Sequence, residues 1–214
     1  MLLLQLLLPA VSLLSSDAAR AATRRWIDRM VIGQRLCPWA APAAVRIVIG
    51  QGEALDMLGH EAALLRTATE PLSTTLIVFL EESLAEPASF GRLYGEARRQ
   101  VRSDIDLLAF HPTRVDSGPG CVADNASDAG HYSVRSPLPT LQLLRTEDLV
   151  ASRRHFEAHA VPGAAAARAR HPRAPGALAL LLENKRRLRS LGTRALQRLL
   201  DNCRDSDDLD SLEC

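Results

Sequence analysis

Four side chains of chemically useful type stand at predicted turns of this sequence: Cys37, His111, Arg135 and Ser136. Cys37 precedes a proline where a helix gives way to a turn, and His111 follows a predicted strand, at the end where ligands bind in open α/β sheets. A neighbouring histidine lowers a thiol pKa and acts as a general base, so Cys37 and His111 are candidate catalytic residues. Arg135 offers a bidentate fork for a carboxylate or phosphate, and Ser136 offers a hydroxyl donor, so these two are candidate ligand-binding residues.

Each of these residues also has an ordinary structural interpretation. A buried cysteine is often an unreactive small apolar group, and a histidine at a strand end often binds backbone atoms. Arg135 can brace a loop through backbone carbonyls, and a Ser-Pro pair commonly begins a turn. The sequence therefore favours a shared pocket for a small anionic ligand or substrate only when the four residues are taken together, and it does not decide whether the protein is an enzyme.

Other kinds of site are poorly supported. Zinc takes nitrogen and sulfur ligands, but the spacing of Cys37, His111, Cys121 and His131 fits no closed zinc motif, so no metal ligands are predicted. The sequence contains no glycine-rich phosphate loop, no G-x-S-x-G elbow and no H-E-x-x-H helix, and we predict no cofactor. The chain is arginine-rich: of its 26 basic residues only Lys185 is a lysine, and its place in a strongly basic helix argues against lysine catalysis.

The strands and helices predicted from the sequence have to position these four residues. Apolar runs predict four strands, at 45–49, 74–80, 105–110 and 138–144. Helical periodicity predicts six helices, at 17–32, 53–66, 90–101, 146–155, 177–190 and 193–203. This alternation implies an α/β fold, with a small mixed or parallel sheet of about four strands and helices packed on it. No helix separates the third and fourth strands, so a ferredoxin-like α+β fold is the alternative.

A single domain is predicted over 17–204, between an apolar extension at 1–16 and an acidic tail at 205–214. The extension has the length of a signal-peptide core but no positive charge before it, so a targeting segment, a structural helix and a wrong start codon are all open interpretations. Cytoplasmic or organellar localisation is favoured over secretion, and the compartment stays unassigned. Within the domain, 160–176 is an insert rich in Ala, Pro and Arg, and 112–137 is a long loop of the kind that is usually functional or disordered.

Composition excludes several classes of protein. The 214 residues are 47% hydrophobic and 24% charged, as in globular chains, and four cysteines make no disulfide framework. A net charge of +1 and 4% aromatic residues argue against nucleic-acid binding. No apolar run reaches the ~20 residues that a membrane-spanning helix needs. The basic C-terminal helix, with Arg186, Arg187 and Arg189, supports a second hypothesis, a non-catalytic scaffold or binding protein that docks an acidic partner.

Four segments, in this order, resemble the family known as domain of unknown function 1415. They are 23–39 with its Leu-Cys-Pro-Trp end, 73–78, 110–112 and 132–145. Asn184 and the Leu191–Gly192 pair also resemble the family's C-terminal helix and its end, so the likeness spans about residues 20–200. The resemblance implies a single domain with a common site, and it carries no established reaction.

Three positions depart from the family pattern. This chain has Val134 where the family usually has Asn, Gln142 where it usually has His, and Arg114 where it usually has an aromatic residue. The resemblance therefore implies a divergent member, and a degenerate, inactive paralogue is the alternative.

Overall fold

The computed structural model describes residues 14–37, 40, 43–50, 52–120, 125–158, 169–170 and 176–205. Several expectations lie outside these ranges: most of the apolar extension, almost all of the Ala/Pro/Arg-rich insert and of the acidic tail, and Cys121.

The four predicted strands and six predicted helices are all present. The helices are α1 (Ser16–Trp26), which continues into the π-helix η1 (Ile27–Ile32), then α2 (Ala54–Thr67), α3 (Pro87–Gln100), α4 (Thr146–Ala158), α6 (Gly176–Leu191) and α7 (Thr193–Arg204). The strands are β1 (Val45–Gly50), β2 (Thr74–Phe79), β3 (Ile105–Phe110) and β4 (Thr140–Arg145), and short 3-10 turns form η2 (Glu82–Ala85) and η3 (Ala129–Val134). Within the described ranges, no helix combines the length and the apolar composition needed to cross a bilayer.

The strands form one mixed sheet in the order β1-β2-β4-β3. β1 pairs parallel with β2, whereas β4 runs antiparallel to both β2 and β3, so β4 lies between two strands that run in the same direction. The predicted α/β fold with a small sheet of four strands is confirmed; of the two arrangements left open, mixed or parallel, the sheet has the mixed one. The segment from β2 to β4 forms the split βαβ unit that a ferredoxin-like fold contains, but the parallel β1–β2 pair makes the ferredoxin-like alternative wrong.

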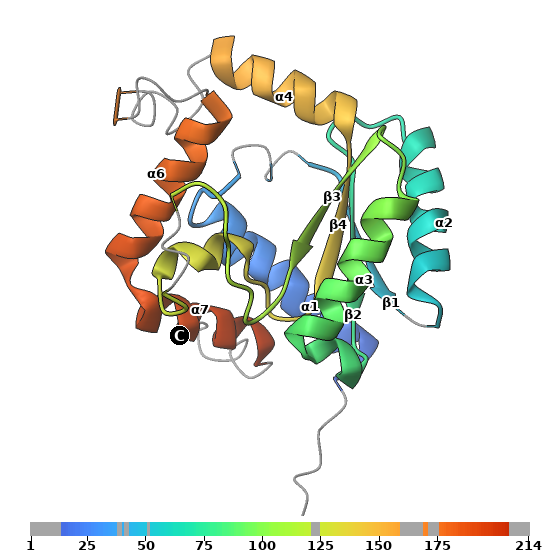
Figure 1. The fold of residues 1–214 in the computed structure, drawn as a ribbon, viewed down its shortest axis with the longest axis horizontal. Helices are drawn as coiled ribbons and strands as arrows, with labels where there is room; N and C mark the ends of the chain where they lie inside the picture. Colours follow the sequence, from blue (N-terminus) through green and yellow to red (C-terminus); the bar gives the residue numbers. More distant parts are fainter. Residues whose placement is uncertain are drawn as a thin grey trace, which may run out of the picture.

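Alternation along the strands gives the sheet two faces, which helices cover from opposite sides (Figure 1). The face toward α2 and α3, here called the α3 face, has a closed core; its strand residues are Ile77, Phe79, Ile105, Leu107, Ala109, Leu141 and Leu143. The face toward α1 and η1, here called the α1 face, packs on these helices, α6 and α7; its buried strand residues are Ile47, Ile49, Leu76 and Val78. The two faces differ in how completely they are covered, which matters for the site.

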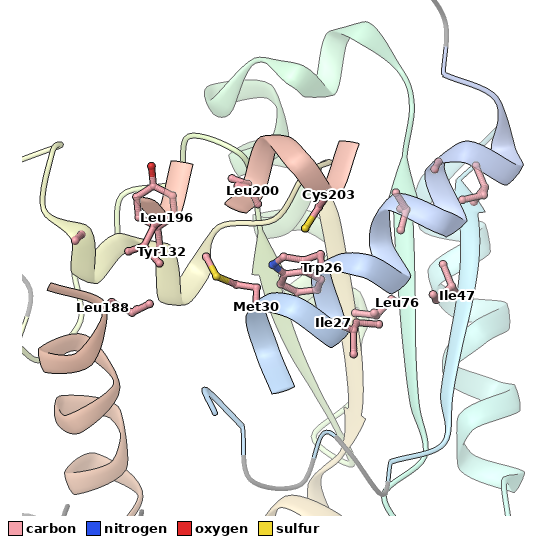
Figure 2. Packing of buried hydrophobic residues seen from close by; sticks show 14 residues of the cluster. Trp26, Ile27, Met30, Ile47, Leu76, Tyr132, Leu188, Leu196, Leu200 and Cys203 are labelled. Carbon is pink, nitrogen blue, oxygen red and sulfur yellow. The ribbon is translucent and has the colours of Figure 1, made fainter. Parts of the chain in front are cut away.

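Trp26 is the centre of packing on the α1 face. Figure 2 shows its ring beside Met30 and Cys203, in the cluster that joins α1 to the C-terminal helices. The ring meets Phe110 edge-on at a centroid distance of 5.2 Å, and its Nε1 donates a hydrogen bond to the Arg135 carbonyl at 3.0 Å. One side chain therefore ties the first helix both to β3 and to the segment that leads into β4.

The long loop predicted at 112–137 is fastened to α6 by two ion pairs. Lys185 is fully buried; its Nζ lies 2.8 Å from Asp116 Oδ2 and donates to the Pro119 carbonyl at 2.7 Å. Arg189 donates two hydrogen bonds to the Asp128 carboxylate, at 2.8 and 2.6 Å. The lysine of the basic helix therefore has a structural role, in which it positions the return of the chain toward β4.

We predict that Asp116→Ala lowers the free energy of unfolding by about 3 to 5 kcal/mol, since removal of one partner of a buried ion pair leaves the charge of the other less compensated. Urea denaturation followed by circular dichroism measures the effect. Asp104→Ala is the matched control: it breaks the exposed Arg66–Asp104 pair at 2.6 Å and is expected to leave the midpoint close to that of the wild type. Equal midpoints for the two variants contradict the role assigned to Lys185.

Candidate functional site

The described residues leave part of the α1 face uncovered, as a hollow of about 270 Å³ over β2, β4 and β3. Leu76, Gln142 and Leu108 form its floor, and they are direct neighbours across the three strands. Leu108 is 42% exposed, which is unusual for a leucine in the middle of a strand. The walls are mostly apolar and include Ile27, Val31, Leu36, Tyr132, Leu144 and Leu149.

Two backbone irregularities border this hollow. In η1 the hydrogen bonds skip to the fifth residue: Gly33 N–H donates to the Asp28 carbonyl at 2.9 Å, and Leu36 N–H donates to that of Val31 at 2.8 Å. Leu72, just before β2, has a φ of +60°, a left-handed conformation that a bulky residue rarely adopts. π-Helical turns and strained residues both concentrate at functional sites, so the local backbone marks this region of the molecule.

Cys37 lies in the wall of the hollow. Its thiol is free of any disulfide and the residue is half-buried, at the end of the turn that follows η1. Of the four predicted site residues, all of which the structure describes, only Cys37 lines the hollow.

His111 instead faces α3. The residue is 2% exposed, and its ring packs on Phe90 at a centroid distance of 5.3 Å. The Nδ1 atom accepts a hydrogen bond from Thr113 N–H at 3.3 Å, so the proton is on Nε2, which donates to the Leu84 carbonyl at 3.2 Å. Burial lowers the pKa of His111 below its ordinary value of 6.5, although the hydrogen bond to Leu84 acts to raise it. The histidine is therefore held as a neutral tautomer by its neighbours.

The alternation of β3 explains this placement. Phe110 points to the α1 face, where it contacts Trp26, and the next residue turns to the opposite side. The structure consequently does not bring His111 together with Cys37: one contacts α3 and η2, and the other lines the hollow beside η1.

Arg135 and Ser136 both make local structural contacts. Arg135 donates from Nε and Nη2 to two loop carbonyls at 3.2 Å each, and its guanidinium lies 4.6 Å from the centroid of the Tyr132 ring. Ser136 is fully buried and donates from Oγ to the Leu138 carbonyl at 2.6 Å. These contacts are the ones expected if both residues have structural roles, with Arg135 bracing the loop and Ser136 beginning the turn into β4.

Of the four zinc candidates, Cys121 lies outside the described residues. Among the described residues, no three His, Cys, Asp or Glu side chains are arranged to hold a metal ion. The His131 ring accepts a hydrogen bond from Asp116 N–H on Nδ1 at 3.0 Å, which leaves Nε2 to donate to the Asn125 carbonyl at 2.9 Å.

A comparison with known protein families gives a match that includes the whole sheet. The family described as Protein of unknown function (DUF1415) matches residues 18–172. The chain belongs to the DUF1415 family. The match contains all four strands and every residue that lines the hollow, but it ends before α6, so the expected likeness at Asn184 and Leu191–Gly192 lies outside it. No curated protein and no solved structure matches the chain.

Sequence reasoning missed the polar residues of the hollow in this DUF1415 protein. Gln142 on β4 donates from Nε2 to Thr74 Oγ1 on β2 at 3.0 Å, and Asp148 and Ser152 of α4 lie in the wall. The sequence did contain a signal for Gln142, which is the single polar side chain inside the apolar run of β4. From the sequence alone it stood out only as a departure from the family pattern.

We predict that His111→Gln removes a component of the pH dependence of stability. As the pH falls below 6.5, the unfolded chain takes up a proton at this histidine while the folded chain resists it, so the free energy of unfolding decreases. Glutamine keeps an N–H donor without a titratable ring. Urea denaturation of both proteins between pH 7.5 and 5.5 measures the slopes, with His60→Gln, on the exposed side of α2, as the control for loss of a histidine. A variant slope as steep as that of the wild type contradicts the account.

Proposed function

We propose that the hollow on the α1 face binds a small, largely apolar molecule. The observation that supports the proposal is a largely apolar floor, with Leu108 at 42% exposure, beneath a cavity of about 270 Å³. An apolar cavity of about 150 Å³ already accommodates benzene, so this one has room for a larger ring system. Concave apolar sites with a few polar groups are the usual form of small-molecule sites.

The contrast between the two faces of the sheet supports this proposal. On the α3 face, Ile77, Leu141 and Leu143 are almost completely buried under helices. On the α1 face, Leu108 and Leu144 belong to the same sheet but keep part of their surface open to the hollow. Exposed apolar surface of this kind is unfavourable in water and is favourable to cover with a ligand.

The charges around the hollow favour a neutral ligand over the anionic one expected from the sequence. Arg145 lies at the end of β4, but its Nε donates to Asp148 Oδ2 at 2.8 Å, and its two Nη atoms donate to the carbonyls of Ala68 and Glu70. The guanidinium is thus already matched by acceptors. Arg135, the predicted clamp for an anion, does not line the hollow.

Binding is a better-supported function than thiol catalysis. Cys37 lines the hollow, but the proposed partner His111 has both ring nitrogens engaged on the α3 side of the sheet. The thiol therefore gains no general base from that histidine.

The scaffold hypothesis receives less support from the arginines of α6. Arg186 binds Glu183 in the preceding turn, Arg187 donates to the Asn184 side chain, and Arg189 binds Asp128. These three guanidinium groups already form hydrogen bonds or ion pairs within their own chain. An acidic partner would have to compete with those contacts in order to bind them.

N-Phenyl-1-naphthylamine, a neutral probe that fluoresces in apolar sites, tests the proposal. We expect it to bind the wild-type protein, and Leu108→Trp to weaken binding about tenfold or more, because the indole takes up cavity volume that the probe needs, and overfilling the remaining space costs about 1–3 kcal/mol. Leu64→Trp is the matched control, since Leu64 is an equally exposed leucine on α2, away from the hollow. Absence of binding to the wild type, or equal loss in both variants, counts against the proposed site.

A further inference from the structure

We infer that the ligand of this hollow carries a neutral hydrogen-bond donor, a hydroxyl or an N–H group, which binds Oε1 of Gln142. The inference rests on the proposed function and specifies the chemistry of the ligand that the same site selects.

A short hydrogen-bond relay fixes the orientation of the Gln142 amide. Thr74 Oγ1 lies 2.9 Å from the Leu143 carbonyl, which only accepts, so the single hydroxyl proton of Thr74 is donated there. The same oxygen lies 3.0 Å from the Gln142 side chain, and it must accept at that contact. The amide nitrogen therefore faces Thr74, and the amide oxygen faces away from it.

The amide oxygen is the group left to be satisfied. Gln142 is half-buried and lies in the cross-strand row between Leu76 and Leu108, with an apolar side chain on each side. No hydrogen bond from the described part of the chain reaches its Oε1. A ligand that donates a hydrogen bond to this oxygen binds more tightly. A ligand without a donor leaves the oxygen unpaired in apolar surroundings and binds more weakly.

The other polar groups of the hollow favour the same kind of ligand. Asp148 lies in the wall, and its Oδ2 accepts a hydrogen bond from Arg145 Nε at 2.8 Å, so the two charges offset each other. An anionic head group would find no arginine, lysine or histidine among the described lining residues, and it would meet the Gln142 amide oxygen in a site of low polarity, where repulsion is poorly screened. A neutral alcohol, phenol or arylamine fits both the apolar walls and the Gln142 acceptor.

Three naphthalenes of similar size test the inference: 2-naphthol has a donor, 2-methoxynaphthalene has none, and 2-naphthoate is an anion. Equilibrium dialysis, with each compound measured by its absorbance, gives the dissociation constants. We expect the wild type to bind 2-naphthol about three- to tenfold more tightly than 2-methoxynaphthalene, the range of one neutral hydrogen bond, and 2-naphthoate most weakly. Gln142→Leu is expected to bring the ratio for the two neutral compounds to about one.

Thr74→Val provides a second, independent variant. Thr74 is a positioning residue, because it orients the Gln142 amide without reaching the ligand's donor itself. Loss of its oxygen is expected to reduce the naphthol preference while 2-methoxynaphthalene binds as in the wild type, a pattern that a general packing defect does not produce. Gln100→Leu, at an exposed glutamine on α3, is the control and should keep the full preference.

The outcomes separate this inference from the proposed function. If 2-methoxynaphthalene binds but the wild type shows no preference for 2-naphthol, or Gln142→Leu keeps it, the donor inference is wrong and the apolar site stands. If neither neutral compound binds the wild type, both are wrong.

Discussion

The insertion of β4 between β2 and β3 is the constraint on which the rest of this structure depends. β4 begins at the end of the sheet where β3 stops, since Phe110 pairs with Thr140, and the long loop after β3 joins these two ends. The loop is irregular, so its position depends on partners outside it, and the buried Lys185–Asp116 pair fastens it to α6. The same insertion sets Gln142 between two leucines and opposite Thr74, which creates the polar point in the floor of the hollow.

The two faces of the sheet divide the molecule into a structural side and a side with open surface. On the α3 face, α2 and α3 cover the strands completely, and the neutral His111 is part of that packing. On the α1 face, Trp26 closes one end of the sheet against the C-terminal helices, and the other end keeps the hollow. The π-helical turn after α1 widens the helix where it borders the hollow, which connects a local irregularity of the backbone to the shape of the site.

The sequence predicted the elements well because their signals are local. The apolar β-branched run of β2 and the helical stripe of α6 identify a strand and a helix without knowledge of their neighbours. Strand order was not predictable, because the direction of β4 depends on a long loop whose anchors lie far away in α6. The candidate site was predictable in part: Cys37 lines the hollow, whereas His111 and Arg135 are satisfied by backbone carbonyls that no sequence pattern reveals. Gln142 was visible as a polar interruption of a strand, but its meaning required the cross-strand register.

Intermolecular nuclear Overhauser effects between 2-naphthol and methyl-labelled leucines give the sharpest test of a ligand site in the hollow on the α1 face. We expect contacts from the naphthalene protons to the methyl groups of Leu76, Leu108 and Leu144, which border the hollow. We expect none to Leu58 or Leu65, which are buried under the α3 face. Contacts confined to the α3 face, or to exposed leucines away from the sheet, would contradict a ligand site in the hollow.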